Sequence, residues 1–278
     1  MKISEATTAW LMAGDPAIRW QTMRDLLDYP ETDWQAEQRL TMTQGWGARL
    51  LASQDVNGIW GGGIYSPKWT SSTYTLLSLH HIGIPADCPP AQRGTGIVLD
   101  HMLGTLFDTD LTQRLNDIDL CIVGMLLQLG AYFQVNDPRL DLLVDNILAE
   151  TMPDGAWNCR RHRAPKPHHS SFHTTANVLD GLRTYLESGG VHRKDELLAA
   201  EHNALKFILD HRLFRSDKTG DVINERWMRL SFPHRWHYDV LRGLCYFARI
   251  GAPRDERMSE AVELIKASFF TMHSPARF

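Results

Sequence analysis

Apolar residues recur along most of the chain at the three- and four-residue spacing of amphipathic helices, whereas the alternating pattern of strands is sparse. One predicted helix follows Asp15 and Pro16, a common helix-start pair, and places Ile18, Leu26 and Leu27 on one face. The pattern therefore predicts an all-α fold.

The predicted helices fall into two alternating series. The first series begins near residues 17, 71, 118, 173 and 238, with starts about 54, 47, 55 and 65 residues apart, a spacing typical of a two-helix repeat. Later members of this series cover 73–79, 119–133, 174–186 and 238–250, and the second series covers 35–53, 94–107, 140–151, 194–211 and 255–270. We expect stacked or ringed helical hairpins in a single domain, residues 1–278.

Two loops that precede first-series helices share a sequence pattern. One contains Gly58 and Trp60, and the other contains Gly155 and Trp157. In each loop, a polar residue and a glycine predict a tight turn, and the tryptophan that follows can pack beneath the next hairpin.

The loop pattern Gln-x-x-x-Gly-x-Trp, carried by Gln54, Gly58 and Trp60 within an all-helical repeat, resembles the repeat of squalene cyclases and protein prenyltransferase β subunits. The resemblance covers about residues 15–270. It implies an α/α toroid, in which inner helices surround a central cavity and outer helices surround the inner ones. The chain departs from that family in having about five hairpins, one fewer than those proteins.

Two helix starts carry a second resemblance. Asp119-Leu120-Cys121 is similar to the zinc-binding Asp-x-Cys of prenyltransferase β subunits. Phe172-His173-Thr174, followed by Leu179-Asp180-Gly181-Leu182, is similar to the aromatic-His-Thr and Leu-x-Gly-Leu of their next inner helix. The resemblance therefore implies a zinc site built from these two helix starts.

Asp119, Cys121 and His173 are the zinc ligands that this resemblance implies. A carboxylate, a thiolate and an imidazole all bind Zn²⁺, and three protein ligands leave a fourth position for water or substrate. Because the inner helices of a toroid begin at one rim of the cavity, we expect these three side chains to converge. The positive end of the helix should also lower the pKa of Cys121.

We expect an enzyme that acts on a small organic substrate in the central cavity. Zinc could activate a substrate thiolate for group transfer, as the resemblance implies, or activate water or polarise a substrate oxygen for hydrolysis or a lyase reaction. His237 and Tyr238 are candidates for the general acid or base beside the metal. Asp117 would either cap the helix or hydrogen-bond a metal ligand.

Further polar and aromatic residues cluster at other predicted inner-helix starts. Arg235 could hold an anionic group, and Lys68 could bind a carboxylate or a diphosphate. The candidate substrate-binding residues are Tyr65, Lys68, Trp69, Tyr74, Arg235 and His169.

The loop before His173 is rich in cysteine, histidine and basic residues. Cys159, His162, His168 and His169 could support the zinc site or form an alternative metal set, and Cys159 with His162 could form half of a structural zinc knuckle. The basic residues form either a solvated loop or a site for an anionic ligand: Arg160, Arg161, Arg163 and Lys166.

Two other functions are compatible with the sequence. Class II terpene cyclases protonate an alkene with the middle Asp of Asp-x-Asp-Asp, but Asp117-Ile118-Asp119 is followed by Leu120, so one carboxylate is missing. A metal-free cyclase would need Asp117 or Asp119 as its acid. The third possibility is a non-catalytic binding module in which zinc is structural or absent.

The composition narrows the class of partner. Of 278 residues, 43% are hydrophobic and 22% are charged, as in ordinary globular proteins, and the net charge of −4 argues against nucleic acid as the main partner. We expect no signal peptide, because residues 1–16 contain no long apolar stretch and no small-residue cleavage site. We expect no membrane span, because the longest apolar run covers only 121–127. Four cysteines without paired spacing favour a reducing cytoplasm. Nothing in the sequence indicates an oligomeric state.

Overall fold

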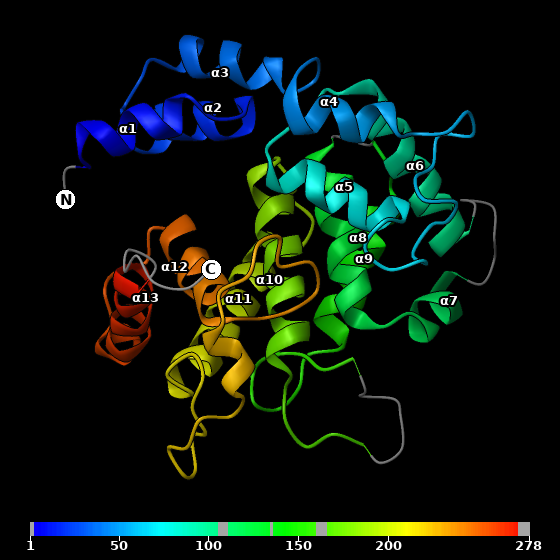
Figure 1. The fold of residues 1–278 in the computed structure, drawn as a ribbon. Helices are drawn as coiled ribbons and strands as arrows, with labels where there is room; N and C mark the ends of the chain where they lie inside the picture. The colour runs from blue at the N-terminus through cyan, green and yellow to red at the C-terminus, as the bar shows by residue number, and fades with distance from the viewer. Residues whose placement is uncertain (1–2, 105–110, 134–135, 160–165, 272–278) are drawn as a thin grey trace. The chain divides into compact units, whose positions relative to one another are not determined.

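The computed structural model describes residues 3–104, 111–133, 136–159 and 166–271 (Figure 1). Across these residues the chain is helical, and β structure is confined to two isolated bridges, Trp60 with Gly63 and Arg215 with Val222. The all-α class predicted from the apolar spacing is thereby confirmed. The helices divide into two compact units.

The first unit comprises residues 1–111 and 129–137. Its helices are α1 (Glu5–Met12), α2 (Pro16–Asp25), α3 (Glu31–Leu40), α4 (Gly45–Ala52), α5 (Ser72–His81), α6 (Pro89–Leu103) and the last turn of α8 (Leu120–Tyr132). Within it, α2 packs on α3 and α5 packs on α6. The Tyr132 hydroxyl donates to the Ile84 carbonyl at 2.8 Å, which ties the end of α8 to the loop after α5.

The second unit comprises residues 112–128 and 138–278. Its elements are α7 (Leu111–Asp117), the first turns of α8, α9 (Arg139–Ala149), α10 (Phe172–Glu187), α11 (Lys194–Asp210), the 3-10 helix η1 (Glu225–Met228), α12 (Val240–Arg249), the 3-10 helix η2 (Glu256–Met258) and α13 (Ser259–Thr271). Within it, α10 packs on α11 and on α12, and α12 packs on α13.

Each helix predicted from the apolar pattern has a counterpart with slightly shifted ends, but the segment 35–53 is broken into α3 and α4. Gly45, at the break, has a φ of 67°, and the Asp15 carboxylate accepts the N–H of Trp46 at 2.8 Å. A side chain at residue 45 would clash with that carboxylate. This contact from a distant residue separates the two helices, and local apolar spacing gives no sign of it. Helices α1 and α7 were also not predicted, and residues 105–107 of the predicted helix 94–107 lie outside the described residues.

The tryptophans of the two loops make equivalent hydrogen bonds. The indole of Trp60 donates to the Leu50 carbonyl at 2.7 Å, and the indole of Trp157 donates to the Ile147 carbonyl at 2.9 Å. Both indoles are almost fully buried, at 1% and 0% exposure. In each case the indole caps the end of the preceding helix, α4 or α9, at the tenth residue before it. The sequence repeat is thus a structural repeat of the turn.

Helices α8 and α10 cross at two glycines in the second unit. A Cβ atom at Gly124 would lie 2.5 Å from the Asn177 carbonyl oxygen, and a Cβ atom at Gly181 would clash with the Gly124 carbonyl. The backbones therefore touch where no side chain intervenes. This crossing fixes how the first turns of α8 and α10 lie relative to one another.

Candidate functional site

The sulfur of Cys159 lies against the start of α8, next to Cys121. The backbone N–H of Cys121 donates to Sγ of Cys159 at 3.2 Å, and the two thiols are hydrogen-bonded to each other. Both cysteines are free and partly buried. Two free thiols held this way are the kind of group that can bind a metal ion or take part in thiol chemistry.

Thr174, in the first turn of α10, holds Cys159 from the other side. Its hydroxyl donates to Sγ of Cys159 at 3.1 Å and accepts the backbone N–H of Cys159 at 3.2 Å. The sulfur therefore faces the N-terminal turns of both α8 and α10. The partial positive charge at those turns favours a negative charge on the sulfur.

The two thiols differ in acidity. The hydrogen bond from the Cys121 thiol is the largest effect on Cys159 and, with help from the Thr174 hydroxyl and against burial, lowers the pKa of Cys159 to about 7. The same hydrogen bond, together with burial, raises the pKa of Cys121 well above its usual value. The first turn of α8 does act on Cys121 in the expected direction, since the backbone N–H of Ile122 lowers its pKa, but the hydrogen bond to Cys159 and burial outweigh that effect. The N–H group at the start of α8 points at the sulfur of Cys159, so the stabilised thiolate is that of Cys159.

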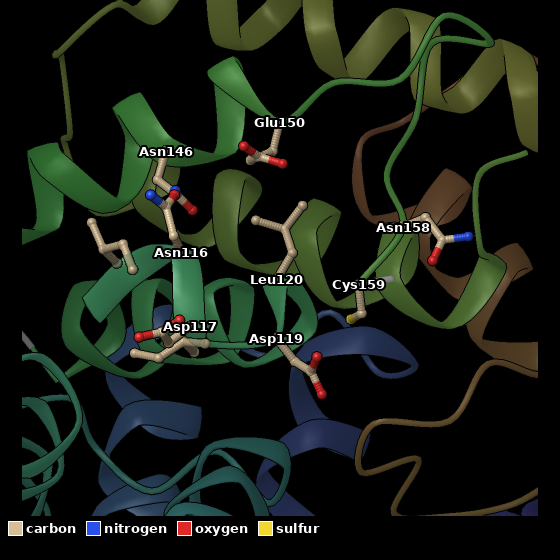
Figure 2. A pocket seen from close by; sticks show the side chains of 10 residues that line it. Asn116, Asp117, Asp119, Leu120, Asn146, Glu150, Asn158 and Cys159 are labelled. Atoms are coloured by element: carbon tan, nitrogen blue, oxygen red, sulfur yellow. The ribbon is translucent and has the colours of Figure 1, made fainter. Parts of the chain in front are cut away.

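Cys159 lines a polar pocket of about 220 Å³ (Figure 2). Three carboxylates share the lining, those of Asp117, Asp119 and Glu150. Amide side chains complete much of its wall: Asn116, Asn146 and Asn158. An acidic, amide-lined pocket suits a cation or a small hydrogen-bonding molecule better than an apolar chain.

Asp119 and Asp117 both reach this pocket, from different positions. Asp119 immediately precedes α8, where its carbonyl accepts the N–H of Ile122 at 2.7 Å, and its charge acts on both Cys121 and Cys159. Asp117 is instead the last residue of α7. Of its two predicted roles, capping α8 does not match this position, because Asp119 occupies it.

His173 lies in the first turn of α10, as predicted, but its ring is engaged elsewhere. Nδ1 accepts the backbone N–H of Tyr238 at 2.8 Å, and the ring packs edge-on against Trp236 and His237. Burial, followed by the charges of His237 and Arg242, lowers the pKa of His173 to about 4, so the ring is neutral near pH 7. A neutral imidazole that accepts at Nδ1 carries its proton on Nε2, so in this arrangement neither nitrogen has a free lone pair.

The predicted zinc site is only partly assembled, and its sulfur side holds donors of a type that zinc accepts. In the part of the chain that the structure describes, no three His, Cys, Asp or Glu side chains form a complete metal-binding group. The Cys121 thiol is nevertheless hydrogen-bonded to the thiol of Cys159, and the charge of Asp119 acts on both sulfur atoms. Backbone and hydroxyl donors to the sulfur are the contacts that support a metal-bound thiolate. To bind a metal ion through Nδ1, His173 would have to give up the hydrogen bond that this nitrogen accepts from the Tyr238 N–H.

The segment before α12 places His237 and Tyr238 differently. The Tyr238 side chain is 2% exposed, and its hydroxyl donates to the Leu213 carbonyl at 2.7 Å. Burial raises the pKa of Tyr238, so this hydroxyl acts as a structural donor here. His237 is exposed and stacks on Trp236, with its ring centroid 5.7 Å from that of His173. Of the two acid–base candidates, the geometry favours His237.

The remaining candidates in the second unit lie on loops. Arg235 has a φ of 56° in the segment before α12, and its anion-binding role stays a prediction. His169 is exposed and lines a separate pocket with Phe172 and Trp227. Lys166 and His168 are also exposed. Four residues of the basic, histidine-rich loop lie outside the described residues: Arg160, Arg161, His162 and Arg163.

The candidates in the first unit form an aromatic cluster. The hydroxyls of Tyr74 and Tyr65 are 2.9 Å apart, and Trp69 packs edge-on against Tyr74 with ring centroids 5.0 Å apart. Tyr74 is buried, whereas Trp69 and Lys68 are exposed. The turn after Trp60 and the first turn of α5 thus gather three of the predicted substrate-binding side chains, and their role with substrate stays a prediction.

Comparisons of the chain with protein-family models, with curated proteins and with solved structures found no significant match. No helix of the described part of the chain has the length and apolar character needed to cross a membrane.

Proposed function

We propose that the protein is a zinc-dependent enzyme that acts on a small polar organic substrate at the pocket beside Asp119 and Cys121. The observation that carries the proposal is the sulfur of Cys159, which lines that pocket and accepts hydrogen bonds from the Cys121 N–H at the start of α8 and from the Thr174 hydroxyl at the start of α10. Packing alone gives little reason to direct backbone and hydroxyl donors at one sulfur atom.

Asp119 and Cys121 would supply a carboxylate and a thiolate to the ion, with His173 as the third ligand. Giving up the bond between His173 and the Tyr238 N–H leaves a donor of a buried residue without its acceptor, which costs about 1–3 kcal/mol. Zinc binding in structural sites contributes about 10–16 kcal/mol, so this exchange is a small opposing term. The present contact of His173 therefore does not argue against ligation.

The bound ion would supply an activated thiolate or hydroxide, or would polarise a substrate oxygen. The other steps belong to side chains of the chain. Asp117 and Glu150 would orient the hydrogen-bonding groups of the substrate within the pocket. His237, exposed next to His173, would transfer a proton to or from the substrate. These roles suit group transfer, hydrolysis or a lyase reaction.

We also propose that the helical repeats close into an α/α toroid of about five hairpins, in one domain. Support comes from the tryptophan turn, which makes the same indole hydrogen bond at Trp60 and at Trp157, as successive copies of one repeated unit should. Further support comes from the backbone contact of α8 with α10, which pairs two first-series helices.

Elemental analysis of purified protein tests the zinc proposal. Wild-type protein should contain about one zinc per chain, and Cys121→Ala should lose it, because a thiolate ligand contributes strongly to the site. Cys245→Ala is the matched control, since Cys245 is an exposed cysteine on α12, and it should retain the metal. Stoichiometric zinc in Cys121→Ala would refute the assignment.

A further inference from the structure

We propose that Cys159 is a second thiolate ligand of the same metal ion. This inference rests on the zinc proposal above and adds a residue that the resemblance to prenyltransferases does not include. The ion would then be held by the sulfurs of Cys121 and Cys159, with Asp119 beside them.

The first argument is position. Sγ of Cys159 accepts the N–H of Cys121 at 3.2 Å, and the two thiols are hydrogen-bonded to each other. An ion bound to either sulfur would therefore lie close to the other. His173, by contrast, has its Nδ1 committed to the Tyr238 N–H, whereas Cys159 would give up only the hydrogen bond from the Cys121 thiol, whose proton leaves when the ion binds.

The second argument is charge. Two thiolates and one carboxylate around Zn²⁺ leave a net charge of about −1, which needs compensation in a partly buried site. The structure supplies it from two helices. The N–H of Cys121 and the hydroxyl of Thr174 both donate to the sulfur of Cys159 from the first turns of α8 and α10. The positive ends of these helices stabilise the excess negative charge.

The third argument is the tether. The backbone N–H of Cys159 donates to the Thr174 hydroxyl at 3.2 Å, and the Trp157 N–H donates to the Thr175 hydroxyl at 3.3 Å. Two successive residues of α10 therefore hold the backbone on both sides of Asn158. This anchoring fixes the sulfur before any ion binds, which reduces the entropy lost on binding.

Cobalt substitution tests the proposal. The protein is reduced, stripped of metal with a chelator and titrated with Co²⁺, and the near-ultraviolet sulfur-to-cobalt charge-transfer band is measured per bound ion. Because each thiolate contributes to this band, Cys159→Ser should reduce its intensity to about half, as should Cys121→Ser. Competition with a zinc indicator should show a loss of zinc affinity beyond roughly 100-fold, the upper end for contacts that only support a ligand.

Two variants serve as controls. Thr174→Val removes the hydroxyl that supports Cys159 and should lower zinc affinity by roughly 10- to 100-fold while leaving the band intensity unchanged. Cys245→Ser should change neither quantity. Circular dichroism of each variant establishes that it is folded, and serine is close in size to cysteine.

The outcomes separate this inference from the zinc proposal. If the wild-type protein binds Co²⁺ and Cys159→Ser keeps the full band, Cys159 is not a ligand, although the metal site stands. If the reduced wild-type protein binds neither Co²⁺ nor Zn²⁺, both proposals fail. A Cys121–Cys159 disulfide that forms instead of metal binding would have the same consequence.

Discussion

The residues of the site that lie at helix starts can be placed from the local sequence, whereas a residue that reaches the site from a loop cannot. Asp119, Cys121 and His173 were placed correctly at helix starts, because first-turn positions can be read from the onset of an apolar run. The sequence does not single out Cys159 as the residue that contacts Cys121. Cys159 appeared only within a set of alternative ligands, because its sulfur reaches α8 through the Trp157 turn and the crossing of two helices.

Tyr238 gives a test at the same scale. Its buried hydroxyl donates to the Leu213 carbonyl, so Tyr238→Phe should lower the free energy of unfolding by about 1–2 kcal/mol in chemical denaturation. Zinc content should not change. Tyr29→Phe, at a side chain that is 45% exposed, should be neutral. Unchanged stability with a large loss of turnover would instead restore the proton-transfer role first predicted for Tyr238.

At the scale of elements, the positions of the helices along the chain are predictable from the sequence, but the contacts between helices are not. The 3.6-residue periodicity gave α8, α10, α11 and α12 within a few residues, because each buries an apolar face. The break between α3 and α4 depends on the Asp15 carboxylate, which is distant in sequence. The family resemblance accounts for Gly181 only as part of a sequence pattern, whereas the structure gives it a physical reason, the close approach to Gly124.

The crossing of α8 and α10 can be tested by filling it. Gly124→Ala places a methyl group 2.5 Å from the Asn177 carbonyl oxygen, and should lower the free energy of unfolding by about 1–3 kcal/mol. It should also weaken zinc binding, because α8 and α10 both contact Cys159. Gly96→Ala, inside α6 with open space around it, should instead stabilise the protein by up to about 1 kcal/mol. Equal effects of both substitutions in urea denaturation would contradict the close crossing.

At the scale of the whole molecule, the sequence predicted the all-α class and the repeat of the tryptophan turn. Closure of the repeats into a ring depends on many small rotations between hairpins, which no local pattern determines. The family resemblance therefore carries the toroid proposal, and the repeated turn supports it.

Small-angle X-ray scattering tests ring closure. A compact chain of this length should have a radius of gyration of about 19 Å, and a toroid should be close to that value. The same measurement on the metal-free protein should give the same value if packing of the helices, rather than the ion, holds the ring. A clearly larger radius with the profile of an elongated particle would indicate an open superhelix.

The central claim is that a zinc ion binds where α8 and α10 begin, and anomalous diffraction at the zinc absorption edge tests it most directly. Crystals of protein purified without added metal should show one strong anomalous peak about 2.3 Å from Sγ of Cys121, the usual zinc–sulfur distance. A second sulfur at the same distance would identify Cys159 as the further ligand. No peak, or a peak away from Cys121, would contradict the account.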